Sequence, residues 1–204
     1  YVYMSGKRLY FQIIVLSISE LFSTENAWNR QKGEVFLFKV GDWLIYGGKG
    51  VCKVIGIGPL ESAKPGSDRL YYTLEPKGSG SRVFTPVDNQ KVIMRPIISK
   101  EDALELIDHM EEIDLLWITD EKHREDHYKE ALRTCDCREW IKMIKTIYTR
   151  KQKRLQQGKK MTSSDERFFK IAEDHLYNEF GLALGMNSGE VETFITERVE
   201  QSIS

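Results

Sequence analysis

Two histidines and two cysteines come closest to the spacing that a chemical site requires. His123 and His127 lie four residues apart, so on a helix both imidazoles could reach one metal ion. The stretch has no HExxH frame, and residues 124–126 are all charged, so an exposed helix face explains the spacing better. Cys135 and Cys137 are separated by one residue, a spacing that strains a disulfide. We therefore predict no metal site, and reduced thiols as in a cytoplasmic protein.

A cluster of glycines in the stretch IYGGKGVCKV is the next candidate, because glycine-rich loops can hold phosphate groups. A P-loop needs the pattern GxxxxGK[ST] leading into a helix, whereas these glycines lead into the apolar run VCKVIGI. A hairpin turn with positive φ explains Gly47, Gly48 and Gly50 better. No nucleophile with an orienting base can be assembled from the sequence either. We expect a protein that is not an enzyme and that holds no cofactor.

The stretch from Phe36 to about Arg95 has the pattern of short strands and turns. Its β-branched or aromatic runs are WLIY, VCKVIGI, LYYTLE, RVFTPV and KVIM. The turn-forming segments GGKG, SAKPGSD and KGSGS lie between them. Five short strands in about 60 residues predict a small barrel, because a curled sheet that closes on itself removes exposed edges.

After Pro96 the pattern becomes helical, and polar capping residues mark where helices begin. The predicted helices are one after Ser99 and Asp102 over ALELIDHMEEIDLLW, one over 120–133, one from Asp136 with Glu139 to Gly158, one from Thr162 with Asp165 to near Gly181, and one from Ser188 to about Val199. In the third of these, we expect the shared face of Trp140, Ile144, Ile147 and Tyr148 to be buried. The second half is thus predicted to be a bundle of about five helices, which makes the fold class α+β.

The first 34 residues differ from the rest of the chain. Lys7 and Arg8 precede the apolar run LYFQIIVLSI, which together resemble the start of a secretory signal. Gln12 interrupts the run, no AxA site follows, and the run is shorter than the ~20 apolar residues of a membrane span. We therefore expect a leader at residues 1–34, a barrel at 35–96, a helical bundle at 97–204, and no membrane association.

Charge is distributed unevenly along a chain that is nearly neutral as a whole, with 30 basic and 31 acidic residues. Acidic residues dominate from Glu101 to Asp126, and basic residues dominate from Arg138 to Lys170. The basic run is either a solvated helix face or a patch that binds a phosphate backbone without reading base sequence. The candidates for phosphate contact in this run are Lys142, Lys145, Arg150, Lys151, Arg154, Lys159 and Lys160.

The order of the motifs resembles the CarD family of bacterial transcription regulators over roughly residues 36–185. The motifs are FKVGDWLIYGGKGVCKV and FTPVDN, followed by HYKEAL, REWIKMIKTIY, GKKMTSSDERF and NEFGLALG. The resemblance implies a Tudor-like or SH3-like barrel that docks on the β subunit of bacterial RNA polymerase. It also implies a helical part that contacts promoter DNA at the upstream edge of the melted region and stabilises the open complex.

By the family pattern, the strand RVFTPV lies in or near the polymerase-facing surface of the barrel. This implies Arg82, Phe84 and Pro86 as contact residues, with Arg82 and Phe84 alternating onto one face. Some relatives carry an arginine at the position of Phe84, and Arg82 could substitute for it from the same face. The glycine hairpin would then shape a barrel whose edge presents backbone and side chains to a partner.

The DNA-contacting side departs further from the family pattern. Relatives often place a tryptophan wedge four residues before the tyrosine that matches Tyr128, and this sequence has Arg124 there. Trp117 is the nearest tryptophan upstream, and it is either a wedge for an opened base step or a core anchor at the end of the first helix. Lys129 and Arg167 match basic positions of the family motifs. The resemblance thus adds Trp117, Arg124, Lys129 and Arg167 to the DNA-binding candidates.

A different class of function stays open at this point. The barrel and the bundle could both bind protein, with the basic helices meeting an acidic partner surface instead of promoter DNA. Salt-dependent binding of DNA separates this protein-protein adaptor from a transcription regulator that contacts DNA.

Overall fold

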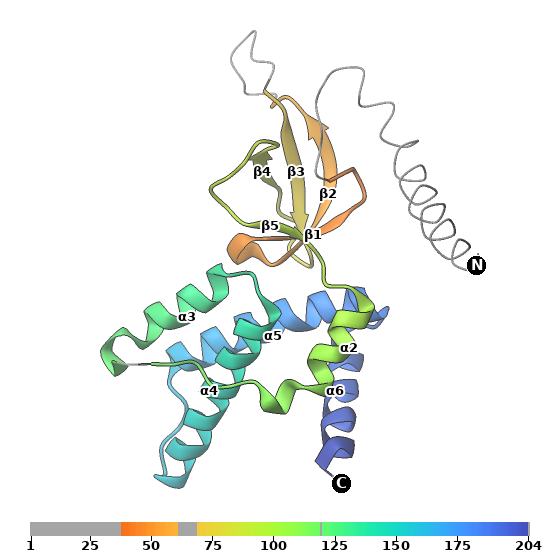
Figure 1. Ribbon diagram of the computed structural model, residues 1–204. Helices are drawn as coiled ribbons and strands as arrows, with labels where there is room; N and C mark the ends of the chain where they lie inside the picture. The colour runs from red at the N-terminus through yellow and green to blue at the C-terminus, as the bar shows by residue number, and fades with distance from the viewer. Residues whose placement is uncertain (1–37, 61–68, 119, 204) are drawn as a thin grey trace, which may run out of the picture. The chain divides into compact units, whose positions relative to one another are not determined.

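The computed structural model describes residues 38–60, 69–118 and 120–203. From Lys39 onward the chain belongs to one unit, in which a β-sheet is followed by helices (Figure 1). The α+β class predicted from the sequence is confirmed. The predicted leader at residues 1–34 lies outside the described residues, and the division into domains at 35–96 and 97–204 stays a prediction.

Five strands form a single antiparallel sheet in the order β4-β3-β2-β1-β5. The strands are β1 (Trp43–Tyr46), β2 (Val51–Gly58), β3 (Tyr71–Pro76), β4 (Val83–Pro86) and β5 (Met94–Pro96). Alternate residues face the buried side, so Tyr72 and Leu74 of β3 are fully buried whereas Tyr71 and Thr73, which alternate with them, are partly exposed. Since β4 and β5 end the order, each pairs with one strand in the described part of the chain.

The turn between β1 and β2 is the glycine-rich stretch, and it contains the short 3-10 helix η2 (Gly47–Lys49). Gly47 and Gly50 have φ angles of 44° and 66°, so the prediction of positive φ is confirmed at these two positions. A Cβ atom on Gly50 would lie 2.6 Å from the His175 ring. His175 packs in turn on Trp140, with ring centroids 5.2 Å apart. Glycine is therefore required where the hairpin contacts the helices.

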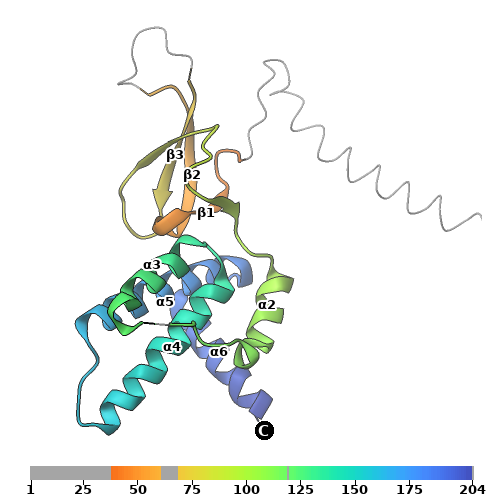
Figure 2. The same ribbon diagram turned by 60° about the vertical axis from the view of Figure 1, so that its left-hand side comes forward.

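Five α-helices follow the sheet, and none in the described chain has the length and apolar character needed to cross a bilayer. The helices are α2 (Lys100–Asp108), α3 (Arg124–Arg133), α4 (Cys137–Gln156), α5 (Ser163–Leu184) and α6 (Ser188–Ile203). The predicted caps of α2, α4 and α5 are confirmed, because Ser99, Asp136 and Thr162 accept hydrogen bonds from the main-chain N–H of Asp102, Arg138 and Asp165. Helices α4 and α5 pack on each other (Figure 2).

The first helix is shorter than the sequence pattern predicted. Helix α2 ends at Asp108, and a short 3-10 helix, η3 (Met110–Glu112), leads into irregular backbone instead of more helix. The residues at this end are acidic, and negative charge at a helix C-terminus opposes the helix dipole. Trp117 therefore does not lie at the end of a helix, and the prediction that placed it there is wrong.

The buried face of α4 also differs from the expected one. Trp140 and Ile147 are fully buried as predicted, but Tyr148 is 51% exposed. The buried face contains Trp140, Ile141, Met143 and Ile147. Ile141 and Met143 thus take the places in the buried face that the predicted stripe gave to Ile144 and Tyr148. Helix α5 likewise continues past the predicted end at Gly181, and Gly185 ends it in the left-handed conformation.

A buried carboxylate joins the sheet to the helices. Glu179 of α5 has no exposed surface and accepts two hydrogen bonds from the Arg95 guanidinium of β5, at 2.5 and 2.9 Å. It also accepts hydrogen bonds from the main-chain N–H of Ile98 at 2.8 Å and from the Cys137 thiol at 3.2 Å. Burial, followed by the charge of Glu179, raises the pKa of the Cys137 thiol, so the thiol keeps the proton that it donates. We call Arg95, Ile98, Cys137 and Glu179 the Glu179 latch.

Candidate functional site

Strand β4 carries the first candidate surface, because it stands at the edge of the sheet. Its side chains alternate, with Phe84 51% exposed and Thr85 buried. The main-chain N–H of Val87 donates to the carbonyl of Leu70 on the β3 side. Hydrogen-bonded pairs alternate along an antiparallel ladder, so Thr85 also directs its main-chain groups to β3, and Phe84 directs its own away from the sheet.

The outer face of the sheet continues the β4 surface. Phe84 lies opposite Thr73 of β3, and Thr73 lies opposite Gly56 of β2. Because glycine has no side chain, little side-chain volume covers the outer face of the sheet in this row of residues next to Phe84. Pro86 lies opposite Tyr71, and it suits an outward-facing position because proline has no N–H to donate. Arg82 is exposed just before the strand. We call Arg82, Phe84 and Pro86 with the outward backbone of β4 the β4 edge.

Trp117 marks a second candidate surface in the helical part. Its side chain is 83% exposed, so the expectation that it is a core anchor is wrong. It borders a hollow on the surface of α4, whose lining is mixed in charge. The lining includes the basic residues Lys142, Arg150 and Lys153, the acidic residues Asp114, Glu121, Glu130 and Glu139, and His127 of α3. An exposed indole beside cations is the arrangement that a wedge against an opened base step needs. We call this the Trp117 hollow.

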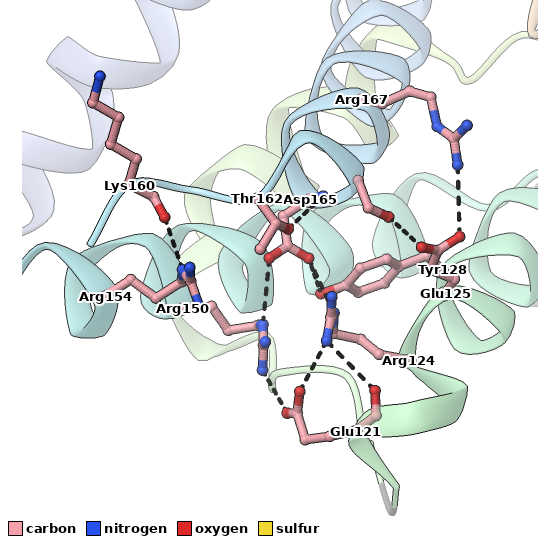
Figure 3. A network of polar contacts seen from close by, with 11 residues as sticks. Glu121, Arg124, Glu125, Tyr128, Arg150, Arg154, Lys160, Thr162, Asp165 and Arg167 are labelled. Carbon is pink, nitrogen blue, oxygen red and sulfur yellow. Dashed lines mark hydrogen bonds and ion pairs between the residues drawn. The ribbon is translucent and has the colours of Figure 1, made fainter. Parts of the chain in front are cut away.

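Two predicted DNA contacts, Arg124 and Arg150, belong to an internal ion network (Figure 3). The carboxylate of Asp165, 1% exposed, lies 3.0 Å from Arg124 Nε and 3.8 Å from Arg150 Nε, and it accepts a hydrogen bond from the Tyr128 hydroxyl at 3.4 Å. Glu121 pairs with both arginines, at 2.9 and 2.5 Å. A buried carboxylate needs such partners, because an uncompensated buried charge is strongly destabilising. The network therefore leaves Arg124 and Arg150 less available to phosphate than the sequence suggested.

Most of the other predicted cations also contact groups of the same chain, and these contacts differ in strength. Lys145 donates to three main-chain carbonyls of residues 110–113. Exposed ion pairs contribute little, so cations in such pairs can exchange their partner for a phosphate. The contacts are Lys129 with Asp126 at 2.9 Å, Lys142 with Glu139 at 2.7 Å, Arg167 with Glu125 at 3.6 Å, Arg154 with the carbonyl of Lys160 at 2.8 Å, and Lys159 with Gln157 at 3.3 Å.

Lys151, Lys153 and Lys160 have ammonium groups that make no hydrogen bond or ion pair within the described residues. Lys153 lines the Trp117 hollow, whereas Lys151 does not line it and interacts electrostatically with Glu173 of α5. Burial and the charge of Glu192 raise the pKa of Glu173, and Lys151 partly offsets them. Lys153 was not among the predicted contacts. Its spacing of eleven residues from Lys142, three helical turns, was the signal that could have identified it.

Residues 38–98 match the family model described as the CarD-like/TRCF RID domain. The chain carries a CarD-like domain. A CarD-like domain interacts with RNA polymerase, so the protein is a transcription-related protein with RNA polymerase as a partner. No curated protein matches the chain. The matched range of the CarD-like domain contains the whole sheet and therefore the β4 edge, whereas the Trp117 hollow lies beyond it.

Proposed function

We propose that the protein is a cytoplasmic, non-enzymatic regulator of bacterial transcription. In this proposal the β4 edge binds the polymerase β subunit, and the Trp117 hollow contacts promoter DNA and stabilises the open complex. The observation that carries the DNA part is the 83% exposure of Trp117 at the hollow that Lys153 also lines. A tryptophan this exposed contributes little to the core, and an aromatic surface at the same hollow as an unpaired lysine suits stacking on bases with phosphates nearby.

The β4 edge supports the polymerase part by its shape and chemistry. An edge strand with outward main-chain groups can accept a strand from a partner, so that the partner extends the sheet. Phe84 adds an exposed apolar side chain, and Arg82 adds a positive charge at the start of the strand. Main-chain hydrogen bonds then provide affinity, while the side chains provide specificity.

Weak binding of phosphates by the cations around the hollow is sufficient for the proposed DNA contact. Tethering through the β4 edge raises the local concentration of the second surface into the millimolar range, so DNA affinity can be modest. Cations on phosphates position a protein without reading bases, so we expect similar contacts on unrelated promoters.

Replacing Trp117 with alanine should shorten the lifetime of the open complex by roughly 5- to 150-fold, the range that the loss of one base–aromatic stacking contact implies. Trp117→Phe should keep most of the lifetime, because phenylalanine still offers an aromatic surface. The lifetime is measured by challenging preformed polymerase–promoter complexes with a competitor. Thermal stability and binding to the β subunit should stay unchanged, since Trp117 is exposed and lies outside the CarD-like domain. An unchanged lifetime for Trp117→Ala would exclude the wedge.

Replacing Lys153 with glutamine should lower the slope of log affinity against log salt for duplex DNA by about 0.9, the value for one neutralised phosphate. Lys151→Gln is the matched control, because residues two apart on a helix point about 200° apart. It should leave the slope unchanged. The measurement is DNA affinity across a salt series for both variants and the wild type. If neither variant changes the slope, the basic face does not neutralise phosphates, and the adaptor with an acidic protein partner becomes the better proposal.

A further inference from the structure

We infer that Lys145 and Thr146 are positioning residues, which fasten the segment 110–118 to α4 and thereby hold Trp117 in its exposed orientation. The inference rests on the proposed role of Trp117 as a wedge. It gives Lys145 a different role from the phosphate contact that its charge suggested. In Figure 2 the chain between α2 and α3 crosses α4. Lys145 and Thr146 of α4 bond to the main chain of Met110 and Leu116 in this connecting segment.

Lys145 donates hydrogen bonds to three main-chain carbonyl groups at the start of the segment. Its ammonium group donates hydrogen bonds to the main-chain oxygens of Met110 at 3.1 Å and Glu111 at 2.9 Å, and to that of Ile113. An ammonium group has three N–H donors, so these three carbonyls use its whole capacity. The carbonyls lie where α2 has ended, and Lys145 supplies partners that a continued helix would have provided.

Thr146 holds the segment next to the tryptophan itself. Its hydroxyl accepts a hydrogen bond from the main-chain N–H of Leu116 at 2.8 Å and donates to the carbonyl of Lys142 at 2.7 Å. The threonine side chain is 7% exposed, so water competes poorly for these two bonds. Leu116 directly precedes Trp117, and the attachment point is therefore one residue away from the indole.

The orientation of Trp117 depends on these main-chain contacts, because packing of its own side chain does not fix it. The segment has no regular secondary structure after η3, and the indole is too exposed to be held by packing. Ile113, which is buried, anchors the segment four residues earlier. A loop that is ordered before binding does not have to lose its conformational freedom on binding. Lys145 and Thr146 thus prepare Trp117 for contact without touching the DNA.

The inference is tested first on the whole 204-residue chain without DNA. In Thr146→Val, which keeps the shape and removes the hydroxyl, the Leu116 amide should exchange its hydrogen at least about 10-fold faster, because its acceptor is gone. Thr146→Ser should restore slow exchange. Thr149→Val is the matched control, because the Thr149 hydroxyl bonds only within α4, to the carbonyl of Lys145, and this variant should leave Leu116 exchange unchanged.

The second test measures open-complex lifetime and the salt slope of DNA binding, with Lys145→Met as the variant that keeps the aliphatic stem. Lys145→Met and Thr146→Val should each shorten the lifetime severalfold when Trp117 is present and have no further effect in Trp117→Ala. The salt slope should stay the same. Near-ultraviolet circular dichroism confirms that each variant is folded.

Three results distinguish the possible failures. If Leu116 exchanges at the wild-type rate in Thr146→Val, Thr146 does not hold the segment and the inference fails. If Lys145→Met lowers the salt slope by about one and still weakens DNA binding in Trp117→Ala, Lys145 contacts phosphate and is not a positioning residue. If Trp117→Ala alone leaves the lifetime unchanged, the wedge is wrong, while the exchange experiment still decides whether Lys145 and Thr146 hold the segment.

Discussion

Replacing Phe84 with proline should weaken binding of the polymerase β subunit by roughly 100-fold. The change removes an outward main-chain donor and an exposed aromatic side chain, and the two losses together amount to about 3 kcal/mol. The bonds between β4 and β3 should survive, because the main-chain groups of Phe84 point away from β3. Proline is tolerated on edge strands for the same reason. Affinity for the isolated β subunit, measured by calorimetry, provides the test.

Two further variants separate the backbone from the side chain at this position. Phe84→Ala keeps the donor, so we expect it to lose roughly 10-fold in affinity, as for one partly buried apolar side chain. Ile93→Ala is the matched control, because Ile93 is 48% exposed, close to the 51% of Phe84, but lies outside β4. It should bind like the wild type. Wild-type affinity in a folded Phe84→Pro protein would show that the β4 edge is not the docking site.

Replacing Glu179 with alanine should lower the free energy of unfolding by about 3–5 kcal/mol, the usual cost of removing one partner of a buried ion pair. The loss leaves the Arg95 guanidinium without its carboxylate and removes the acceptor of the Ile98 N–H and the Cys137 thiol. Urea denaturation followed by far-ultraviolet circular dichroism measures the change.

Controls for the Glu179 latch use the pairs that the chain itself offers. Asp88→Ala breaks the ion pair between Arg69 and Asp88, whose side chains are 54% and 67% exposed, respectively. This change should leave the unfolding midpoint nearly unchanged. Arg95→Met combined with Glu179→Leu should recover part of the lost stability, because apolar residues of similar volume can replace a buried pair. A loss below about 1 kcal/mol for Glu179→Ala would contradict the proposed importance of the latch.

Much of the helical architecture could be predicted because its signals are local. Ser99, Asp136 and Thr162 cap helices by bonds to residues two or three positions ahead, so the sequence contains both partners side by side. The errors fall where the deciding partner is distant. Helix α2 stops at Asp108, and the carbonyls beyond it bond to Lys145, which lies more than thirty residues later.

The candidate sites divide in the same way. The order of the motifs led to the CarD-like domain. The alternation in RVFTPV placed Arg82 and Phe84 on one face, and the structure shows that Phe84 is exposed. The basic run from Arg138 to Lys170 was visible as a run, but its members differ in role. A sequence shows the charge of a residue, whereas its availability depends on which carboxylate folding brings near it.

By itself the sequence determined the α+β class, most helix starts and the glycine hairpin, because each depends on neighbours within one turn or one strand. The order of the motifs along the chain also indicated the CarD-like domain. The tertiary structure alone decided that Trp117 is exposed and that Arg124 and Arg150 are held by Asp165. Asp165 lies 41 positions after Arg124, and such long-range pairing depends on how α3, α4 and α5 pack, which no local pattern encodes.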